Sequence, residues 1–168
     1  MKRPLTYIIG AVAAAAIGLG TYFAFFARNA APAVEFVTLN GQKLTTADLR
    51  GKVVLVNFWA TSCVACVEEM PDIVATHRKY AEKGFETVAV AMSYDPPNYV
   101  VHFTETRALP FKVALDSSGE IAKRFGDVRL TPTTFILDKR GHVIKRYLGK
   151  PNFAELHALL EAKLGEPG

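Results

Sequence analysis

The sequence predicts an α/β protein in which helices cover both faces of a β-sheet. Runs typical of strands alternate with runs typical of helices along residues 34–168, and the chain closes with a strand hairpin and a helix. The clearest strand is Val53–Phe58, which is apolar and β-branched, and a C-x-x-C pair, Cys63 and Cys66, follows it closely. A chain of 168 residues has room for one domain.

The N-terminal segment predicts a membrane anchor. Residues 5–26 are 22 uncharged residues, preceded by Lys2 and Arg3 and followed by Arg28. As a helix with a rise of 1.5 Å per residue they would span about 33 Å, close to the ~30 Å hydrocarbon core of a bilayer. The apolar region of a cleaved signal peptide is shorter, about 7–15 residues, which favours an uncleaved anchor. The positive-inside rule then places residues 1–4 in the cytoplasm and the domain outside it.

Residues 27–33 are predicted to form a short tether between this anchor and a domain over residues 34–168. The small residues Ala31-Pro32-Ala33 leave a cleavage site as the alternative, but the length of the apolar run favours retention. The pI of 9.1 does not indicate nucleic-acid binding. Beyond Arg28 there are 17 basic and 16 acidic residues, a net charge of +1, and they form no basic run.

The elements around the cysteines follow from alternation and turn signals. Residues 34–39 alternate as a strand does, and Asn40-Gly41 is a hairpin-turn signal. Thr45–Leu49 has the composition of a short capped helical turn. After the cysteines, helix-forming residues continue to about Ala81, and Pro71 inside this run predicts a kink.

The second half of the chain continues the alternation. A central strand is predicted over Phe85–Met92, and Asp95-Pro96-Pro97 breaks the chain after it. The later predicted elements are, in order, a helix over Asn98–Arg107, a strand over Phe111–Leu115, a helix over Ser118–Phe125, strands over Thr133–Leu137 and His142–Tyr147, and a helix over Asn152–Leu164. The last two strands flank the turn Asp138–Gly141, which predicts a hairpin.

The two cysteines are predicted to lie where a strand ends and a helix begins. Free backbone N–H groups and the helix macrodipole stabilise negative charge there, and such a site lowers the pKa of a cysteine from about 8.5 to between roughly 3.5 and 7.5. Cys63 is nearer the helix start, so it is the predicted attacking thiolate. Cys66, one turn along the same side, is the predicted resolving thiol, which releases the substrate from a mixed disulfide.

Other uses of a C-x-x-C pair have less support. Zinc needs two more ligands at short spacing, whereas the sequence has no further cysteine and its histidines are single: His77, His102, His142 and His157. A c-type haem needs a histidine directly after the second cysteine, where this sequence has Val67. A structural disulfide is the simplest alternative, but the order of strand, C-x-x-C and helix favours redox chemistry.

The stretch Trp59–Pro71, W-A-T-S-C-V-A-C-V-E-E-M-P, resembles the active site of the TlpA/ResA/CcmG group of thioredoxin-like proteins. The most specific matches are Gly51–Ala60, Glu69–Pro71 and Leu130–Phe135, and the likeness covers roughly Val34–Leu164. It implies a thioredoxin-like fold with a central mixed sheet, helices on both faces, an extra helix and strand, and one N-terminal transmembrane helix. It also implies a single-pass protein of the bacterial cytoplasmic membrane, whose catalytic domain faces the periplasm or the cell exterior.

The resemblance gives three further positions a predicted role in docking. Members of the family have a cis proline that faces the C-x-x-C, and its equivalent here is Pro132. A cis bond would expose the backbone of Thr131 for pairing with an extended substrate; without the resemblance, a trans bond would be expected. Trp59 is expected to pack beside the sulfurs and to shape the docking surface.

Glu69 is the predicted proton acceptor for Cys66. The resembling group has an acid at this position that is proposed to help proton transfer, and Cys66 must lose a proton before it attacks. Thioredoxin has a buried aspartate where this chain has Asn57, which cannot titrate. The alternative is that Glu69 is a solvated acid on the helix surface.

The resemblance implies a reductant of protein disulfides, for example those of apocytochrome c or of copper-site proteins in oxidase assembly, with a membrane thiol donor supplying electrons. No metal and no cofactor are expected beyond a redox-active Cys63–Cys66 disulfide. The alternatives are a disulfide-donating oxidant, a Cu(I) chaperone and a peroxidase. Copper chaperones on this fold use C-x-x-x-C, one residue longer than the spacing here, and peroxiredoxins use T-x-x-C, where this chain has Ala60.

Overall fold

The computed structural model describes residues 16, 18, 20 and 29–167. The predicted anchor, residues 5–26, lies outside the described residues apart from Ala16, Gly18 and Gly20, which are helical. Within the described part of the chain, no helix combines the length and the apolar character needed to cross a membrane. The segment Ala31–Gly168 is one structural unit.

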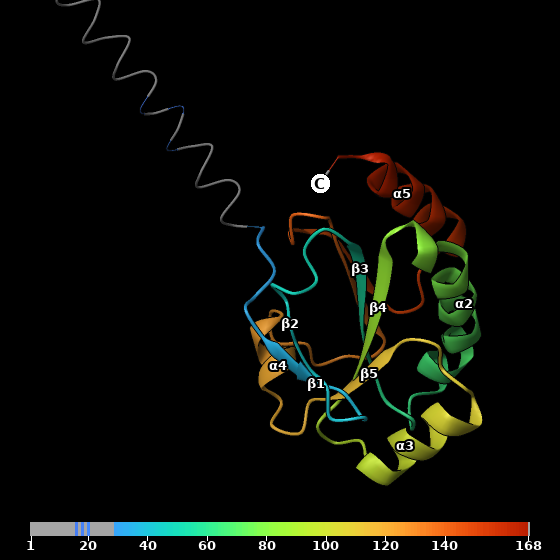
Figure 1. Cartoon of the computed structure of the whole chain (residues 1–168). Helices are drawn as coiled ribbons and strands as arrows, with labels where there is room; N and C mark the ends of the chain where they lie inside the picture. Colours follow the sequence, from blue (N-terminus) through green and yellow to red (C-terminus); the bar gives the residue numbers. More distant parts are fainter. Residues whose placement is uncertain (1–15, 17, 19, 21–28, 168) are drawn as a thin grey trace, which may run out of the picture. The chain divides into compact units, whose positions relative to one another are not determined.

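A five-stranded mixed sheet forms the centre of this unit (Figure 1), in the order β5-β4-β3-β6-β7. The strands are β3 (Val53–Trp59), β4 (Phe85–Ala91), β5 (Lys112–Leu115), β6 (Thr133–Leu137) and β7 (Val143–Leu148). β3, β4 and β5 run parallel, whereas β6 is antiparallel to β3 and β7 is antiparallel to β6. Every residue of β3 and β4 is buried, as expected for parallel strands that are covered on both faces.

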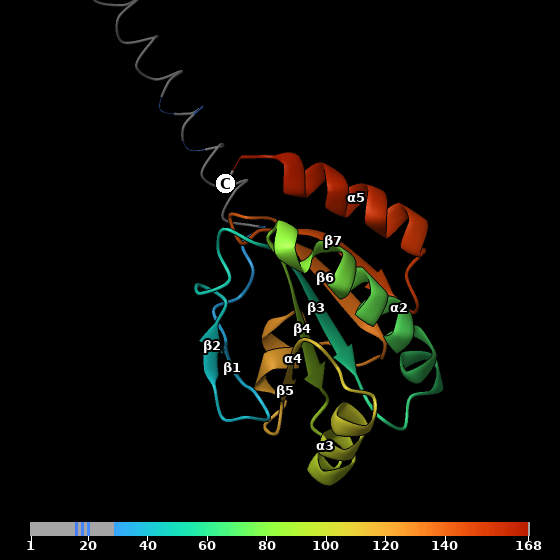
Figure 2. The ribbon, with the colours of Figure 1, turned by 45° about the vertical axis from the view of Figure 1, so that its right-hand side comes forward.

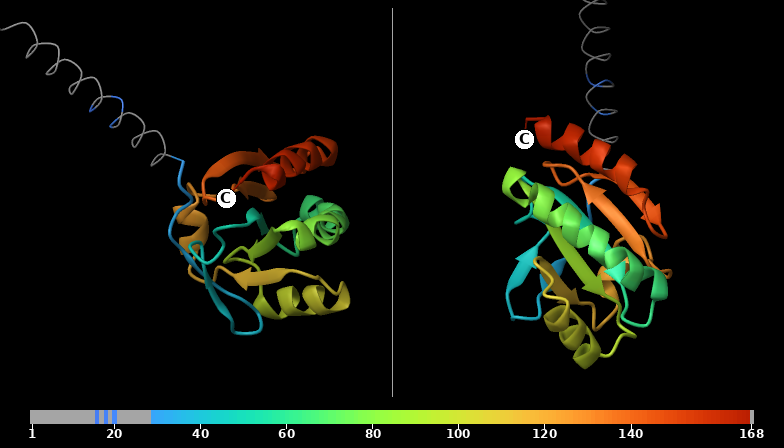
Figure 3. Two further views of the ribbon diagram at one scale, coloured as in Figure 1. Left: turned by 45° about the horizontal axis from the view of Figure 1, so that its top comes forward. Right: turned by 90° about the vertical axis from the view of Figure 1, so that its right-hand side faces the viewer.

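Helices cover both faces of this sheet (Figures 2 and 3), as the alternation of elements predicts. One face carries α2 (Val64–Tyr80), α3 (Pro97–Thr106) and α5 (Phe153–Gly165). The opposite face carries the short helix α4 (Glu120–Arg124). A 3-10 turn, η1 (Ala81–Lys83), connects α2 to β4.

The side chains of β3 alternate between two hydrophobic cores, because successive residues of a strand point to opposite faces. Val53 and Leu55 pack in one cluster with residues of α2 and α5, including Leu160. Val54 and Phe58 pack in the other cluster with residues of α4, and the rings of Phe58 and Phe125 meet edge to face with centroids 5.3 Å apart. This double burial fixes the position of the C-terminal end of β3, from which the C-x-x-C turn leaves.

A separate two-stranded antiparallel sheet, β1 (Glu35–Val37) and β2 (Lys43–Thr45), covers part of the α4 face. Phe36 is its fully buried anchor. The backbone N–H of Leu39 donates to the carbonyl of Val113 over 2.9 Å and so attaches this hairpin to the edge strand β5.

The structure confirms most of the predicted elements and corrects two. β2 was not predicted, and the segment after it forms successive turns in which Thr45 and Asp48 cap each other, not a helix. α4 is shorter than the predicted Ser118–Phe125, because Gly119 has φ +75°, outside the helical region. The predicted extra helix and strand are α3 and β5.

Candidate functional site

The C-x-x-C turn joins the end of β3 to the start of α2. Cys63 is the N-cap residue of α2 and Cys66 lies in its first turn, and the two are joined in a disulfide with Cα atoms 5.2 Å apart. The backbone N–H of Cys66 donates to Sγ of Cys63 over 3.2 Å. Cys63 is partly exposed, whereas Cys66 is fully buried. A substrate can therefore reach the sulfur of Cys63 but not that of Cys66, and the helix N-terminus stabilises a thiolate at Cys63.

Glu69 lies in the core, not on the helix surface. It is fully buried, and its Oε1 accepts a hydrogen bond of 2.9 Å from Nδ2 of Asn57. The same amide donates to Oγ1 of Thr134 over 2.9 Å. Asn57 and Thr134 face each other in the antiparallel pairing of β3 with β6, so two strands hold the partner of Glu69 in place.

Burial raises the pKa of the Glu69 carboxyl from 4.5 to about 7, although the hydrogen bond from Asn57 and the positive charge of Lys150 act in the opposite direction. Glu69 and Cys66 are both fully buried and stand three positions apart on α2, which places them on the same side of the helix. A carboxyl that titrates near neutral pH can both accept and return a proton. This environment suits the predicted role of Glu69 and excludes the solvated alternative.

Several polar atoms around Glu69 lack a protein partner among the described residues: Oε2 of Glu69, Oδ1 of Asn57 and Nε1 of Trp59. Buried polar atoms usually have a hydrogen-bond partner, so these three atoms are available for a further polar contact. They lie on β3 and α2, the two elements that the C-x-x-C turn connects.

Trp59 packs beside Cys66, and Cys63 contacts the same cluster. Its indole ring is tilted against the ring of Phe103 from α3, with centroids 5.1 Å apart. The side chain is fully buried, so Trp59 supports the surface from below and does not itself present a docking surface. The position of Trp59 beside Cys66 agrees with the prediction that it packs next to the sulfurs, and its part in shaping the docking surface stays a prediction.

The Thr131–Pro132 peptide bond is cis, in agreement with the resemblance. Thr133 directly follows and pairs with Phe58, so Pro132 lies at the edge of the sheet from which the cysteines leave. Thr131 is partly exposed, and its hydroxyl lies 3.2 Å from the hydroxyl of Tyr94. The fold therefore brings the two sequence-distant parts of the predicted site to one edge.

Asp95 supports the site structurally, whereas its sequence context, Asp95-Pro96-Pro97, predicted only the end of the preceding strand. It is buried, and its carboxylate accepts hydrogen bonds of 2.6 Å from both the backbone N–H and the hydroxyl of Thr61. Thr61 lies two positions before Cys63, so Asp95 holds the start of the C-x-x-C turn. One feature of the sequence could have indicated this role. Asp95 follows β4, the parallel neighbour of β3, and the carboxyl ends of parallel strands lie at the same edge of a sheet, so Asp95 is expected near the C-x-x-C turn.

Large apolar side chains are exposed near the cysteines and Pro132. Four of them have exposed fractions above one half: Val64 at 72%, Tyr94 at 56%, Leu130 at 62% and Leu148 at 64%. Val64 is adjacent to Cys63, and the other three lie next to or opposite the segment around the cis bond. Apolar side chains gathered in this way mark a surface for contact with another polypeptide.

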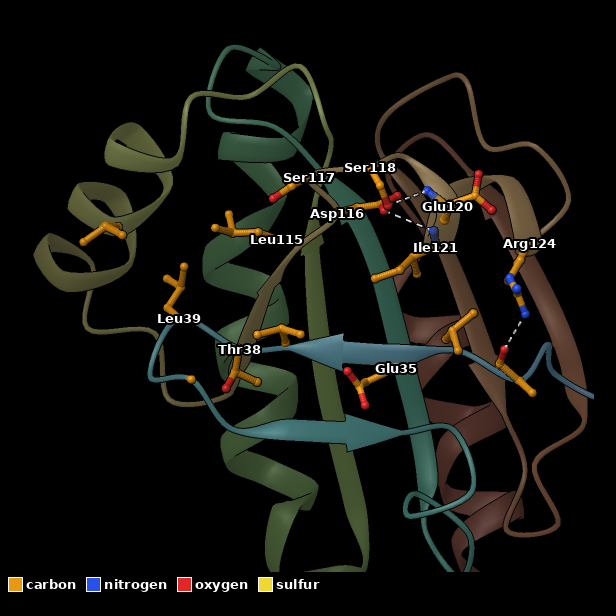
Figure 4. A pocket seen from close by; sticks show the side chains of 15 residues that line it. Glu35, Thr38, Leu39, Leu115, Asp116, Ser117, Ser118, Glu120, Ile121 and Arg124 are labelled. Carbon is orange, nitrogen blue, oxygen red and sulfur yellow. Dashed lines mark hydrogen bonds between the residues drawn. The ribbon is translucent and has the colours of Figure 1, made fainter.

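A broad pocket of about 790 Å³ lies elsewhere in the unit, between β1, the segment after β5 and α4 (Figure 4). Its main charged groups already have partners. Asp116 accepts from the backbone N–H groups of Ile121 and Ala122, and Arg124 donates to the carbonyl of Ala33. The residues that line this pocket come neither from the C-x-x-C turn nor from the cis-proline segment.

Across the part of the chain that the structure describes, no three His, Cys, Asp or Glu side chains are grouped in a way that could hold a metal ion.

Comparisons with known proteins agree with this geometry. The sequence profile described as Redoxin matches residues 26–160. The thiol-disulfide oxidoreductase ResA of Bacillus cereus is 35% identical to this chain over 162 residues, which cover 92% of each protein. Among solved structures, a protein of Neisseria meningitidis described as a thioredoxin has a TM-score of 0.76 and 37% identity, covering 80% of this chain and 89% of its own. A Chlorobium tepidum protein described as the thiol:disulfide interchange protein DsbE has a TM-score of 0.75 and 28% identity, with coverage of 82% and 96%.

Proposed function

The chain belongs to the Redoxin family, and from this premise we propose that it is a thiol–disulfide oxidoreductase that reduces disulfides of protein substrates. The observation that carries the proposal is the pairing of a partly exposed Cys63 at the start of α2 with a buried Cys66 and the buried, titratable Glu69. These features separate an attacking sulfur from a resolving sulfur and provide a base for the second.

The reaction takes place in two exchanges. In the reduced protein the Cys63 thiolate attacks one sulfur of the substrate disulfide, forms a mixed disulfide and releases the other substrate sulfur as a thiolate. Cys66 then passes its proton to Glu69 and attacks Sγ of Cys63, which releases the second substrate thiolate. Two electrons have moved to the substrate, and the protein holds the Cys63–Cys66 disulfide that the structure contains.

Docking is assigned to the edge of the sheet around the cysteines. The partly exposed Thr131 next to the cis Pro132 offers backbone groups to an extended segment, and the exposed side chains of Val64 and Leu130 offer apolar contact. Trp59 and Asp95 keep this surface in place from below.

The reducing activity is tested with the full-length protein in a neutral detergent. Insulin serves as the protein disulfide and dithiothreitol as the electron source. Wild type should accelerate the precipitation of insulin chains, and Cys63→Ser should reduce the rate to that of dithiothreitol alone. Activity of Cys63→Ser at the wild-type level would refute the assignment of Cys63 as the attacking residue.

The substrates proposed are apocytochrome c or copper-site proteins, with a membrane thiol donor as the electron source. Support comes from the ResA and DsbE likenesses. The in-cell redox state of the cysteines tests the direction: cells are quenched with acid, and free thiols are tagged with a mass-shifting alkylator. Mostly reduced cysteines agree with a supplied reductant, whereas mostly oxidised cysteines would indicate a disulfide-donating oxidant.

The membrane anchor at residues 5–26 and an extracytoplasmic domain are part of the proposal. The support is the uncharged length of the segment and the basic residues Lys2 and Arg3 before it. Carbonate-washed membranes should retain the full-length protein, and protease added to spheroplasts should digest the domain. Release of the protein into the soluble fraction with a shortened N-terminus would indicate a cleaved signal peptide instead.

A further inference from the structure

A groove between α2 and α3 begins beside the cysteines. Its volume is about 330 Å³. Apolar side chains from both helices line it, among them Val67, Val74 and Phe103, and Arg78 and Arg107 lie at its rim. We call this feature the α2–α3 groove.

The groove continues the side of α2 on which the attacking cysteine stands. Cys63, Val67, Val74 and Arg78 follow one another at intervals of four, seven and four residues, a spacing that keeps them on one side of a helix. On the far side of Phe103 and Arg107 a second hollow of about 400 Å³ extends to Thr61, two residues before Cys63. A polypeptide attached to the sulfur of Cys63 thus meets this groove directly.

The two charged side chains that line the groove, Arg78 and Arg107, are both basic. Among the described residues, no carboxylate lies within ion-pair distance of Arg78 or Arg107, whereas the neighbouring Lys79 pairs with Glu161 at 3.2 Å. The guanidinium of Arg107 lies over the ring of Phe103, 5.6 Å from its centroid. Two guanidinium groups that line one pocket repel each other and favour an anionic occupant. A carboxylate meets this requirement, because it can accept two parallel hydrogen bonds from a guanidinium.

The backbone of α2 adds one more polar group to the groove. Pro71 has no N–H, so the carbonyl of Val67 lacks the donor that a helix would normally supply. Both residues line the groove. The groove therefore combines apolar side chains with two cationic donors, which fits a peptide better than a purely apolar ligand.

On the basis of the function proposed above, we propose that the α2–α3 groove binds the stretch of substrate polypeptide that extends from the attacked cysteine and selects an acidic residue farther along that stretch. Arg78 stands 15 positions after Cys63, which is about 22 Å along the helix. An extended chain covers about 3.3 Å per residue, so the acidic side chain lies about seven residues from the attacked cysteine. The selected substrate is thus a segment with apolar residues near the cysteine and Asp or Glu farther along.

The test uses pairs of synthetic peptides whose single cysteine is joined to glutathione in a mixed disulfide. The two members of a pair differ only in carrying Glu or Lys seven residues from the cysteine, with the spacing tested on each side. The reduced full-length protein in neutral detergent should reduce the Glu peptide about five- to tenfold faster, since exposed ion pairs contribute modestly. The preference should disappear in 1 M NaCl, because the Debye length falls to about 3 Å.

The test variant is R78E/R107E, and the matched control is R50E/R140E. R78E/R107E should reverse the preference between the two peptides. R50E/R140E makes the same change of net charge near the start of β3, at the sheet edge opposite the cysteines, and should keep the wild-type preference. Hydroxyethyl disulfide, which is too short to extend from Cys63 to Arg78, should be reduced at the same rate by wild type and both variants.

Trp59 offers a second readout, because it is the only tryptophan and its ring contacts Phe103 of the groove. A non-reactive Glu peptide with Ser in place of the cysteine should change the tryptophan fluorescence of wild type, and this change should be lost in R78E/R107E.

The results distinguish a failure of the groove proposal from a failure of the oxidoreductase assignment. Failure of wild type to reduce hydroxyethyl disulfide would overturn the oxidoreductase assignment. Normal reduction of that compound, with equal rates for Glu and Lys peptides, would overturn only the groove. If the peptides are not distinguished but phosphatidylglycerol added to the detergent changes the tryptophan fluorescence of wild type and not of R78E/R107E, the groove serves an anionic membrane surface and the proposal for substrates is wrong.

Discussion

At the scale of single residues, Glu69 connects the stability of the domain to its chemistry. The hydrophobic interior that makes its carboxyl a useful base also makes the ionised form unfavourable. The amide of Asn57 offsets part of this cost through its hydrogen bond. The exposed neighbour Glu68 shares the helix but not the environment, so it is the matched control for Glu69.

Glu69→Gln should remove a titration near pH 7 from the exchange rate. In wild type the rate of the second exchange should rise as the pH passes about 7, because ionised Glu69 accepts the proton of Cys66. Stopped-flow measurement of substrate release at pH 5.5 to 8.5 checks this. Glu68→Gln should retain the wild-type profile, and a wild-type profile in Glu69→Gln would show that Glu69 has no part in proton transfer.

The same substitution should stabilise the oxidised protein at alkaline pH. Below pH 4.5 the carboxyl is protonated in both the folded and the unfolded chain, so it does not alter stability. Above that pH the carboxyl of the unfolded chain loses its proton first, so the free energy of unfolding falls as the pH rises. The fall ends once the pH passes the folded pKa of about 7, and it amounts to at most about 3 kcal/mol.

Urea unfolding of wild type and Glu69→Gln at pH 4.5 and pH 8 measures this difference. The variant should gain stability relative to wild type only at pH 8. An equal difference at both pH values would mean that the carboxyl is not held in its neutral form by burial.

Asp95 should control the C-x-x-C turn through Thr61. Asp95→Ala removes the acceptor of two hydrogen bonds and leaves the Thr61 backbone N–H unpaired, which should lower the free energy of unfolding by about 2–3 kcal/mol. Exchange with hydroxyethyl disulfide should also slow, because Cys63 loses its fixed position. Thr61→Ser keeps the hydroxyl and serves as control; unchanged stability and rate in Asp95→Ala would contradict this role.

The sequence predicts the residues of the site that form a local motif, but it does not predict the distant residues that hold them in place. Cys63, Cys66 and Glu69 follow one another at intervals of three residues, so spacing along the chain predicts their arrangement. Thr134 reaches Asn57 across 77 positions, and Asp95 reaches Thr61 across 34. Contacts of that kind depend on which strands are neighbours, and local patterns do not determine this.

At the scale of elements, α5 is held by an apolar stripe that packs on the sheet and on α2. Leu160 is fully buried in the cluster that also contains Tyr80 and Ile136. Asn152 caps the helix by accepting from the backbone N–H groups of Ala154 and Glu155. The periodicity of leucines predicted this helix to within one residue at each end.

Leu160→Ala should therefore lower the free energy of unfolding by about 2–5 kcal/mol, because it leaves a cavity in a closely packed core. Thermal and urea unfolding of the oxidised protein measure the loss. Leu159→Ala, at a half-buried position of the same helix, is the control and should cost clearly less. Equal losses for the two substitutions would mean that Leu160 is not a core residue.

The elements that sequence patterns missed are short and depend on tertiary contacts. β2 has three residues with one buried side chain, Leu44, which is too little alternation to detect. It exists because Leu44 pairs with the buried Phe36 across the small sheet. α4 was predicted, but it begins two residues later than expected because Gly119 has φ +75°, and the carboxylate of Asp116, from the end of β5, then accepts from N–H groups at its start.

At the scale of the whole structural unit, the sheet brings the residues of the candidate site together at one edge. β3 delivers the cysteines, β4 delivers Asp95, and the antiparallel β6 begins directly after Pro132. The mixed order of strands is what brings the cis-proline segment to the cysteines, since a strand parallel to β3 would begin at the opposite edge. Fold class followed from the alternation of elements and the mixed character of the sheet from the resemblance to a known family, whereas the order of the strands comes from the structure.

Trapping of the mixed disulfide tests whether Cys63 is the attacking thiol and Cys66 the resolving thiol. Full-length Cys66→Ser is expressed in cells, which are quenched with acid and analysed on non-reducing gels. The account predicts species of higher mass that collapse to the monomer with dithiothreitol and are absent from Cys63→Ser. Mixed disulfides in Cys63→Ser and none in Cys66→Ser would contradict the assignment of the two cysteines.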